Sequence, residues 1–401
     1  MDLSEAREKI LNSLKRLSGS ESVAVARACN RVAMQPARAL VSLPPFPCSA
    51  MDGYAIRFDD LEGSPPYVMK LIGQSLAGHP YDGESAPGEC IRIFTGAPMP
   101  TGLDCVVIQE NCSTDGAEVH LLENVSAGAN VRPMGHDILK GDPVVETGKI
   151  ITAFDVGWLA ACGITHVQVV RKLRVALFST GDELADPGAK LDYGQIYESN
   201  RFTLTQLLAG IPLEIDDLGI LPDDPELIET AMLQAANSCD VLLTSGGVSV
   251  GDADFVKEVL QKIGHLEIWR LNLKPGKPLA FGRINDALFF GLPGNPVSTI
   301  VTFLLMVKPA LLALSGVASS EPLSFTATLR EPIKHKPGRE EYQRGRLTRI
   351  DEQTFVDVTG DQSSNRMATF SDADCLIKIP KTCGDLATNS SVSVLPFKGL
   401  L

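Results

Sequence analysis

The sequence lacks the residue groupings that mark several classes of protein. None of its nine cysteines forms a CxxC pair, and no histidine lies at zinc-ligand spacing from one, which argues against common structural zinc motifs. The odd, dispersed cysteine count predicts reduced thiols in a cytoplasmic protein. No continuous apolar run reaches the roughly 18 residues of a membrane-spanning helix. The charged, amphipathic N-terminus lacks the apolar centre of a signal peptide.

The sequence also lacks an excess of basic residues. It has 36 Lys and Arg against 49 Asp and Glu, a formal net charge of −13 over 401 residues. This balance argues against a general nucleic-acid binder, because phosphate contacts need a basic face. The acid is unevenly distributed, since residues 269–283 carry four basic residues and no acidic one. That segment predicts a local pocket for a small oxyanion.

The length exceeds what one hydrophobic core usually organises, so we expect two to four domains. Short apolar runs separated by Gly, Pro, Asn and Asp predict a β-rich N-terminal domain. Strands alternating with helices then predict a mostly parallel sheet, and alternating segments near the C-terminus predict a small β domain. Residues 4–17 predict a helix capped by Ser4, and 151–165 predict another that ends at Gly163. The expected domains are 1–40 with 145–172 (helical or linker), 41–144 (β-rich), 173–314 (α/β) and 318–401 (C-terminal β).

Polar or glycine-rich loops follow five successive strands of the predicted α/β domain. Ligands of open α/β sheets bind beyond the carboxyl ends of the strands, so these loops predict one site. Glycines let backbone N–H groups approach an anion, and two lysines on a loop stiffened by Pro275 and Pro278 supply positive charge. The loop residues are Ser245, Gly246, Gly247 and Ser249, then Arg270, Lys274 and Lys277, then Pro293, Gly294, Asn295, Pro296 and Ser298.

Carboxylates stand on three of the same loops, at Glu183, Asp223, Asp252 and Asp254. Mg²⁺ binds one or two carboxylates together with substrate phosphate oxygens, so the set indicates Mg²⁺-assisted chemistry on a phosphorylated substrate. Helix capping is the competing interpretation for each acid taken alone, Asp252 in particular. By composition, the charged loops of the β-rich region are turns.

Strings spread along the whole chain resemble the MoeA family of molybdopterin molybdenumtransferases, which includes the E domain of gephyrin. They are PFPCSAMDGYAIR, IRIFTGAPMP, NVRPMGHDI, VALFSTGDEL, YESNR, TSGGVSVGDADF, KPGKPLAFG and GLPGNPVS. The resemblance implies a four-region subunit in a homodimer. It also implies Mg²⁺-dependent insertion of molybdate into adenylated molybdopterin with release of AMP.

The resemblance further implies roles for individual residues. It implies functional acids, oxyanion-binding residues, and loops of the β-rich domain that serve the partner subunit's site. Two positions depart from the pattern: His136 replaces a frequent acid, and Arg270 stands where lysine is common and is not its equivalent at an oxyanion. The implied residues are Asp52, Thr95, Arg132, Asp137, Glu183, Asp223, Asp254, Lys274, Lys277, Ser298, Arg344, Ser363 and Ser364.

On this interpretation the two glycine-containing loops hold the pterin and its phosphates, and Lys274, Lys277 and Arg344 bind molybdate. Asp223 and Asp254 hold Mg²⁺, and either Glu183 or Asp254 handles the attacking water. Molybdopterin adenylyltransferase activity and a gephyrin-like binding scaffold remain alternatives, as does tungstate in place of molybdate. The expected protein partners are a molybdopterin adenylyltransferase and cofactor-accepting enzymes. No nucleic acid or membrane partner is expected.

Overall fold

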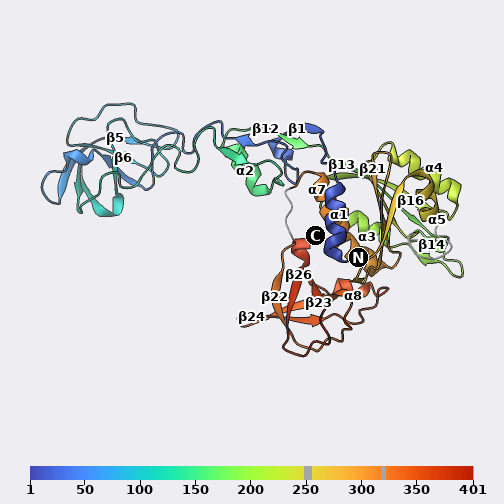
Figure 1. Ribbon diagram of the computed structural model, residues 1–401. Helices are drawn as coiled ribbons and strands as arrows, with labels where there is room; N and C mark the ends of the chain where they lie inside the picture. Colours follow the sequence, from blue (N-terminus) through green and yellow to red (C-terminus); the bar gives the residue numbers. More distant parts are fainter. Residues whose placement is uncertain (248–254, 318–321, 401) are drawn as a thin grey trace.

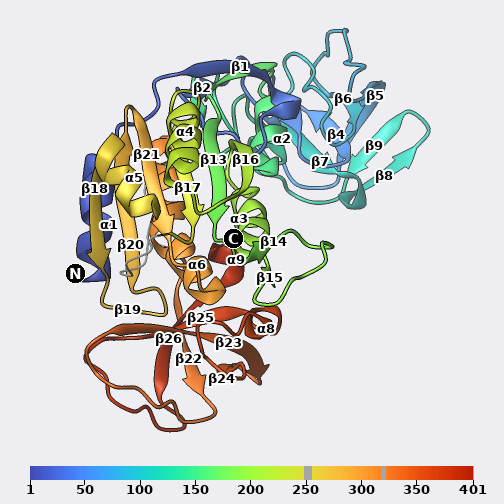
Figure 2. The same cartoon turned by 90° about the vertical axis from the view of Figure 1, so that its right-hand side faces the viewer.

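The computed structural model describes residues 1–247, 255–317 and 322–400, which form an elongated molecule of four regions (Figure 1). A central α/β domain contacts a C-terminal β-barrel on one side and a small connecting region on another. A β-rich module projects beyond the connecting region, far from the barrel. Figure 2 shows the same separation after a 90° turn. The predicted multidomain fold, with an α/β domain flanked by β-rich regions, is confirmed.

The α/β domain is built on a six-stranded sheet with helices on both faces. Its strand order is β16-β13-β17-β21-β20-β18; the first four strands run parallel and the last two pairings are antiparallel. Alternate residues of β13 divide between two apolar cores, with Val175 and Leu177 on one face and Ala176 and Phe178 on the other. The strands are β13 (Leu173–Thr180), β16 (Leu213–Leu221), β17 (Val241–Ser245), β18 (His265–Arg270), β20 (Pro278–Ile284) and β21 (Ala287–Leu292).

Two helices, α4 and α5, cover one face of this sheet, and α1, α3, α6 and α7 pack into the core on the other. The carboxylate of Asp224 caps α4 by accepting from the backbone N–H groups of Glu226 and Leu227, and Pro225 occupies the first turn. The described helices are α1 (Leu3–Ser13), α3 (Asn200–Leu208), α4 (Pro225–Ala236), α5 (Phe255–Ile263), α6 (Pro296–Thr302) and α7 (Lys308–Leu314), and a short pair, β14 (Leu184–Ala185) and β15 (Ile196–Tyr197), precedes α3.

One helix of this domain is unusually long and apolar. It runs through α6, a π-helical turn (Phe303–Val307) and α7, and its 19 residues are long and apolar enough to cross a membrane. However, 78% of its apolar 18-residue window is buried inside the structure. Its composition is therefore that of a core helix, whose apolar surface is satisfied by the sheet and by α1.

The C-terminal domain is a closed barrel. Its strands pair in the order β23-β24-β22-β26-β25, and β25 pairs again with β23, which closes the ring. A short strand of the α/β domain, β19 (Leu273–Lys274), adds to the outer end of β23 in parallel register. The barrel strands are β22 (Phe325–Leu329), β23 (Glu340–Ile350), β24 (Gln353–Val358), β25 (Cys375–Ile379) and β26 (Ser391–Pro396), with short helices α8 (Ala368–Ser371) and α9 (Phe397–Leu400).

The connecting region joins two distant parts of the chain. Its largest pairing is antiparallel, between β1 and β12, and Thr152 caps α2 in a reciprocal box with Asp155. Gly163 follows α2 with φ +80°, which confirms the expected helix end. The elements are β1 (Ser20–Ala24), a 3₁₀ turn (Val25–Arg27), β2 (Ala37–Arg38), β11 (Pro143–Val145), α2 (Ala153–Ala161) and β12 (His166–Val170).

The β-rich module contains a six-stranded sheet of order β7-β4-β6-β5-β9-β8 and a separate pairing of β3 with β10. Two apolar clusters, one on each side of the sheet, hold the module together. The strands are β3 (Cys48–Ser49), β4 (Gly53–Ile56), β5 (Tyr67–Ser75), β6 (Glu89–Ile93), β7 (Cys105–Ile108), β8 (Cys112–Asp115), β9 (Glu118–Leu121) and β10 (Val131–Arg132), with 3₁₀ turns at Phe58–Asp60 and Gln109–Asn111.

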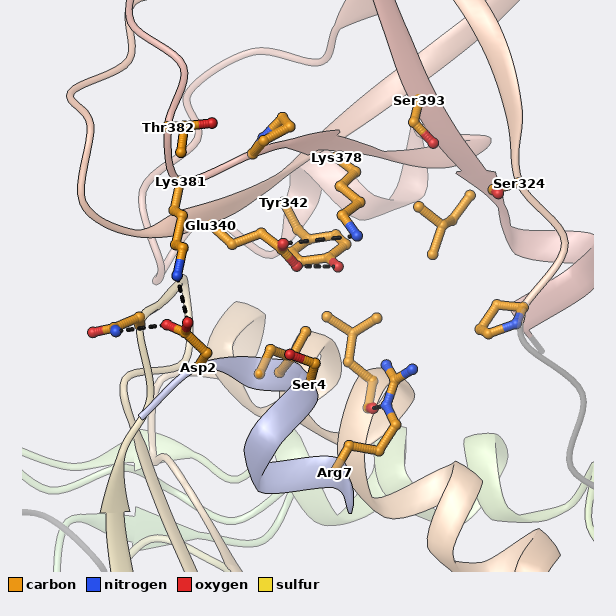
Figure 3. Close-up of a pocket in the computed structure, with 16 residues that line it drawn as sticks. Asp2, Ser4, Arg7, Ser324, Glu340, Tyr342, Lys378, Lys381, Thr382 and Ser393 are labelled. Carbon is orange, nitrogen blue, oxygen red and sulfur yellow. Dashed lines mark hydrogen bonds and ion pairs between the residues drawn. The ribbon is translucent and has the colours of Figure 1, made fainter. Parts of the chain in front are cut away.

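The N-terminal helix α1 packs differently from the sequence-based grouping of residues 1–40 with 145–172. Leu3, Ala6 and Ile10 are buried in the α/β core, because they form an apolar stripe that contacts α7. The helix begins at Leu3, so Asp2 rather than Ser4 occupies the N-cap position. The Asp2 carboxylate accepts a hydrogen bond from Asn272 and forms an ion pair with Lys381 of the barrel (Figure 3).

Candidate functional site

A cleft of about 690 Å³ lies where the carboxyl ends of the parallel strands face the C-terminal barrel. Strands β13, β17 and β21 deliver loops to it, β19 delivers a lysine, and the barrel supplies the opposite wall. This is the position at which open α/β sheets bind ligands, and it is where the strand-end loops were expected to meet. The predicted residues that line it are Glu183, Asp223, Gly246, Gly247, Lys274, Lys277, Pro293, Gly294, Asn295, Ser298, Ser363 and Ser364.

Glycines allow two loops to approach each other at the floor of the cleft. Gly246 and Gly247 have φ of +93° and +66°, a region that favours glycine. A Cβ on Gly247 would stand 2.4 Å from the side chain of Val256, so no larger residue fits without movement. A Cβ on Gly294 would lie 3.9 Å from the Cα of Gly246. Two backbone segments therefore line the floor with little side-chain bulk.

Asn200 fastens these two loops together. Its side-chain amide donates to the hydroxyl of Ser245 at 2.6 Å and to the carbonyl of Gly294 at 2.7 Å. Ser245 is consequently buried beneath the cleft rather than lining it. Asn200 was not among the expected site residues, although it stands in the YESNR string. Its place at the start of the helix that follows this string could have indicated a role in the site.

Three cationic side chains line the cleft. Lys274 and Lys277 were expected, whereas Arg339, from the segment that leads into β23, was not. The Lys274 ammonium lies 3.0 Å from Oε1 of Glu341, a buried carboxylate of the barrel. Arg270, at the end of β18, and Pro296, at the start of α6, do not line the cleft. The positive charge expected from the sequence thus comes from two domains.

Carboxylates crowd one side of the cleft. Asp223 lies beside Asp182 and Glu183, and partial burial together with these two negative neighbours raises the pKa of Asp223. Among the described residues, no three His, Cys, Asp or Glu side chains form a ready-made metal centre. Mg²⁺ does not need one, because it binds one or two carboxylates and completes its shell with phosphate and water. The repulsion around Asp223 is the kind of environment that a divalent cation relieves.

Three predicted positions, Ser249, Asp252 and Asp254, lie outside the described residues.

The barrel wall is organised by Arg344, which is fully buried and does not itself line the cleft. Its guanidinium donates to the Thr369 hydroxyl at 2.9 Å and to carbonyls of residues 361–363 at 3.1–3.3 Å. Burial lowers the pKa of Arg344 to about 10. These bonds hold the segment that presents Gln362, Ser363 and Ser364 to the cleft. Gln362 was not predicted from the sequence. Its side-chain oxygen also accepts a hydrogen bond from the backbone N–H of Arg344.

The predicted residues of the β-rich module form a separate group. Oδ1 of Asp52 accepts hydrogen bonds from both the backbone N–H and the hydroxyl of Thr95, each at 2.8 Å, and these bonds lower the pKa of Asp52. Arg132 ends β10, and Asp137 lies in the turn that follows, where its backbone N–H donates to Leu43. None of the four lines the cleft of the same chain. Their module lies at the opposite end of the molecule (Figure 1).

A second pocket, of about 470 Å³, separates α1 from the barrel (Figure 3). Its lining includes Lys381, paired with Asp2, and Lys378, 3.7 Å from Glu340. No parallel strand of the described α/β sheet ends there. The strand-end cleft therefore remains the candidate site.

Family models and known proteins match the chain along its length. Residues 1–163 match the MoeA N-terminal region (domain I and II), 176–313 a probable molybdopterin binding domain, and 326–397 the MoeA C-terminal region (domain IV). The chain is 38% identical over 405 aligned residues to the molybdopterin molybdenumtransferase of Haemophilus influenzae, with both proteins fully covered. It is 32% identical to gephyrin of Dictyostelium discoideum, covering 98% of this chain and 61% of gephyrin.

A solved structure agrees. The molybdopterin biosynthesis MoeA protein from Pyrococcus horikoshii superimposes with a TM-score of 0.82 at 30% identity, covering 100% of this chain and 99% of that one.

Proposed function

The chain belongs to the MoeA family, and from this relationship we propose that it is a molybdopterin molybdenumtransferase that completes the molybdenum cofactor. The proposed reaction inserts molybdate into adenylated molybdopterin, depends on Mg²⁺ and releases AMP. The observation that carries the proposal is the strand-end cleft, in which lysines and an arginine face carboxylates above two glycine loops. A substrate that joins phosphates, a pterin and an oxyanion needs this combination of groups.

The cationic side chains would bind the oxyanions. Lys274, Lys277 and Arg339 present ammonium and guanidinium donors to the cleft, which suits the dianion molybdate and the substrate's phosphates. The segments Gly246–Gly247 and Pro293–Asn295, with Ser298, would hold the phosphates and the pterin, because they line the cleft. On this assignment, the cations and the two loops bind different parts of the substrates in the same cleft.

The carboxylates would bind Mg²⁺ and position the attacking water. Asp223 fits a Mg²⁺ ligand, since its neighbours disfavour its charge in the absence of a cation, and Asp254 is the second ligand on our proposal. When bound, Mg²⁺ would neutralise phosphate charge during hydrolysis. Either Glu183 or Asp254 positions the water whose oxygen attacks phosphorus. The phosphoanhydride bond then breaks, and AMP leaves.

The β-rich module would act on the partner's cleft in a homodimer. Asp52, Thr95, Arg132 and Asp137 belong to the β-rich module, which lies far from the cleft of its own chain (Figure 1). These residues could therefore reach a cleft only in a second subunit. In the proposed two-fold dimer each module would lie against the other subunit, and each cleft would then draw on two chains. We propose this arrangement together with a cytoplasmic location. The proposed protein partners are a molybdopterin adenylyltransferase upstream and enzymes that accept the finished cofactor.

The test of the function is a reconstituted reaction. Purified protein with adenylated molybdopterin, Mg²⁺ and molybdate should release AMP and yield cofactor that activates a molybdenum-free acceptor enzyme. Omitting molybdate or adding a Mg²⁺ chelator supplies the controls, and tungstate in place of molybdate measures oxyanion preference. Absence of AMP release would contradict the proposal. Release of pyrophosphate from ATP and unadenylated molybdopterin would assign the adenylyltransferase reaction instead.

A further inference from the structure

We propose that Glu341, held between Lys274 and His335, is a positioning residue that fixes the Lys274 ammonium in the cleft for an oxyanion of the substrates. The inference deepens the proposed function and rests on it. Lys274 belongs to the α/β domain and Glu341 to the barrel, so their ion pair joins the two walls of the cleft. The barrel on this proposal sets the geometry of a substrate-binding lysine as well as closing the site.

The backbone brings the two residues together. Strand β19 pairs with the start of β23 in parallel register, with Leu273 opposite Glu340 and Lys274 opposite Glu341. The Lys274 ammonium then lies 3.0 Å from Oε1 of Glu341. The Lys274 side chain keeps 46% of its surface exposed, whereas Glu341 keeps 3%. The carboxylate is therefore a fixed anchor, and the lysine reaches from it into the cleft.

The carboxylate is held on its other sides by the barrel. The side-chain amide of Gln343 donates to the same oxygen, Oε1, at 2.9 Å. The second oxygen, Oε2, is buried, has no hydrogen-bond partner among the described residues, and lies 3.7 Å from Nε2 of His335. A buried carboxylate with an unpartnered oxygen is costly unless a positive charge lies nearby. Lys274 supplies that charge to Oε1, and His335 is the group that can supply it to Oε2.

The contacts of His335 agree with this role. Its Nδ1 lies 2.9 Å from the carbonyl of Cys383, and its Nε2 lies 3.2 Å from the carbonyl of Arg339. A neutral imidazole has one N–H and would turn a lone pair towards one of these carbonyls, whereas the charged ring donates to both. Oδ1 of Asp385 accepts the backbone N–H of His335 at 2.9 Å, and Oδ2 of Asp385 lies 2.8 Å from the Lys334 ammonium at the surface.

Neighbouring cations explain how Glu341 can hold Lys274 without removing the positive charge of the cleft. Lys277 and Arg339 also line the cleft, and the buried Arg344 interacts electrostatically with Glu341. An anion in the cleft therefore still meets a positive field, and it meets an ammonium in one position. Holding a binding group in its productive place is worth a large rate factor, because an error of about 1 Å can cost roughly 100-fold.

The test is a double-mutant cycle measured as kcat/KM for AMP release, with molybdate and adenylated molybdopterin varied in turn. Glu341→Gln keeps the shape of the side chain and removes its charge, and we expect a fall of about 10- to 100-fold. In the Lys274→Met background the same substitution should change kcat/KM less than about twofold, since Glu341 acts through the missing ammonium. The substrate whose KM rises identifies the oxyanion, molybdate or phosphate.

Glu340→Gln is the matched control. Glu340 precedes Glu341 on the same strand, but its carboxylate contacts Tyr342 at 2.6 Å and Lys378 at 3.7 Å, away from the cleft, so AMP release should stay unchanged. Glu341→Asp, which keeps the charge, should recover most of the loss. Equal costs of Glu341→Gln in both backgrounds would overturn the positioning role.

If the wild-type protein releases no AMP, the proposed function fails, and equilibrium binding of molybdate alone is measured through the same cycle. Binding of inorganic phosphate is measured in the same way, because Lys274 could hold either oxyanion. Coupling with either anion would support the positioning inference by itself, and absence of coupling with both would overturn it.

Discussion

Asp182 and Asp223 each accept a hydrogen bond from the other's backbone. The N–H of Asp182 lies 3.3 Å from Oδ2 of Asp223, and the N–H of Asp223 lies 3.2 Å from Oδ1 of Asp182. The exchange locks the loop after β13 to the loop after β16 and forces two carboxylates together. Partial burial, with the charges of Asp182 and Glu183, raises the pKa of Asp223 despite the stabilising hydrogen bond. The loops therefore hold negative charge in a place that suits a cation.

Asp223→Asn should lower AMP release by about 100-fold, because a ligand of the proposed cation is lost while the loop is kept. The stability of the folded protein should not fall with the activity. A folded pKa above the usual value of 3.8 means that Asp223 contributes stability below that value and loses it as pH rises through the folded pKa. At neutral pH the variant should unfold at a temperature equal to or above that of the wild type. Calorimetry at pH 4 and pH 7, together with the AMP assay, measures both effects.

The adjacent residue provides the control for Asp223. The carboxylate of Asp224 caps α4 through the N–H groups of Glu226 at 2.8 Å and Leu227 at 3.1 Å. Asp224→Ala should cost about 1 kcal/mol of unfolding free energy and leave AMP release intact. The two substitutions thus predict opposite signatures. Loss of activity in Asp224→Ala, or a large loss of stability in Asp223→Asn, would contradict this assignment.

The sequence predicted the strand ends well because each is a local pattern. Buried runs such as those of β13 and β17, followed by Gly181 and Gly246 respectively, indicate both the strand and the loop beyond it. The barrel wall was harder to predict, since Arg339 and Gln362 reach the cleft only because the barrel docks on the α/β domain, where β19 pairs with β23 and joins residues 67 apart in the chain. The predicted position of α1 was wrong for a related reason. Its apolar stripe of Leu3, Ala6 and Ile10 indicates that the helix is buried but does not indicate which domain it packs against.

Two inactive variants should restore activity to each other if clefts are shared in a homodimer. Asp52→Ala removes a group from the β-rich module, and Lys274→Met removes one from the cleft. A purified mixed dimer would contain one intact site and one site with both defects, so it should show about half of the wild-type rate. Differently tagged chains allow its isolation, and AMP release measures the recovery.

The matched mixture combines Lys274→Met with Asp223→Asn. Both residues line the cleft of the same chain, so each subunit of that mixed dimer carries a defective site and no activity should return. Recovery in this second mixture, or none in the first, would contradict sharing between subunits.

Arg344→Lys should lower stability more than it lowers intrinsic chemistry. Lysine keeps the charge but loses the planar fork that donates to the carbonyls of residues 361–363, and we expect about 2–3 kcal/mol of destabilisation. KM should rise, because Ser363 and Ser364 are presented by that segment. Urea unfolding and substrate titration measure the two effects. A rise in KM at unchanged stability would instead support direct contact of Arg344 with the oxyanion.

Arg346→Lys is the control on the same strand. Arg346 is exposed and lies 3.2 Å from Asp372, so the exchange should alter stability by less than about 1 kcal/mol.

Because Thr95 orients the Asp52 carboxylate, substitutions at the two positions can separate the effect of the Asp52 charge from the effect of its orientation. Thr95→Val removes the hydroxyl donor but leaves the backbone donor, so the pKa of Asp52 should rise towards its usual value while the side chain stays ionised at neutral pH. Because the folded pKa is lowered, Asp52 contributes stability above about 3.8 and loses it as pH falls through the folded value. Carbon-13 titration of the carboxyl group measures the pKa change.

Asp52→Asn makes the complementary change, since its amide oxygen can accept both bonds without a charge. If the carboxylate acts through its charge on the partner's substrate, Asp52→Asn should reduce AMP release by about 100-fold and Thr95→Val by about tenfold. Both variants should have the wild-type rate profile between pH 6 and 8, because neither brings the titration of Asp52 into that range. A larger loss in Thr95→Val than in Asp52→Asn would show that orientation of the loop, rather than the charge of Asp52, carries the effect.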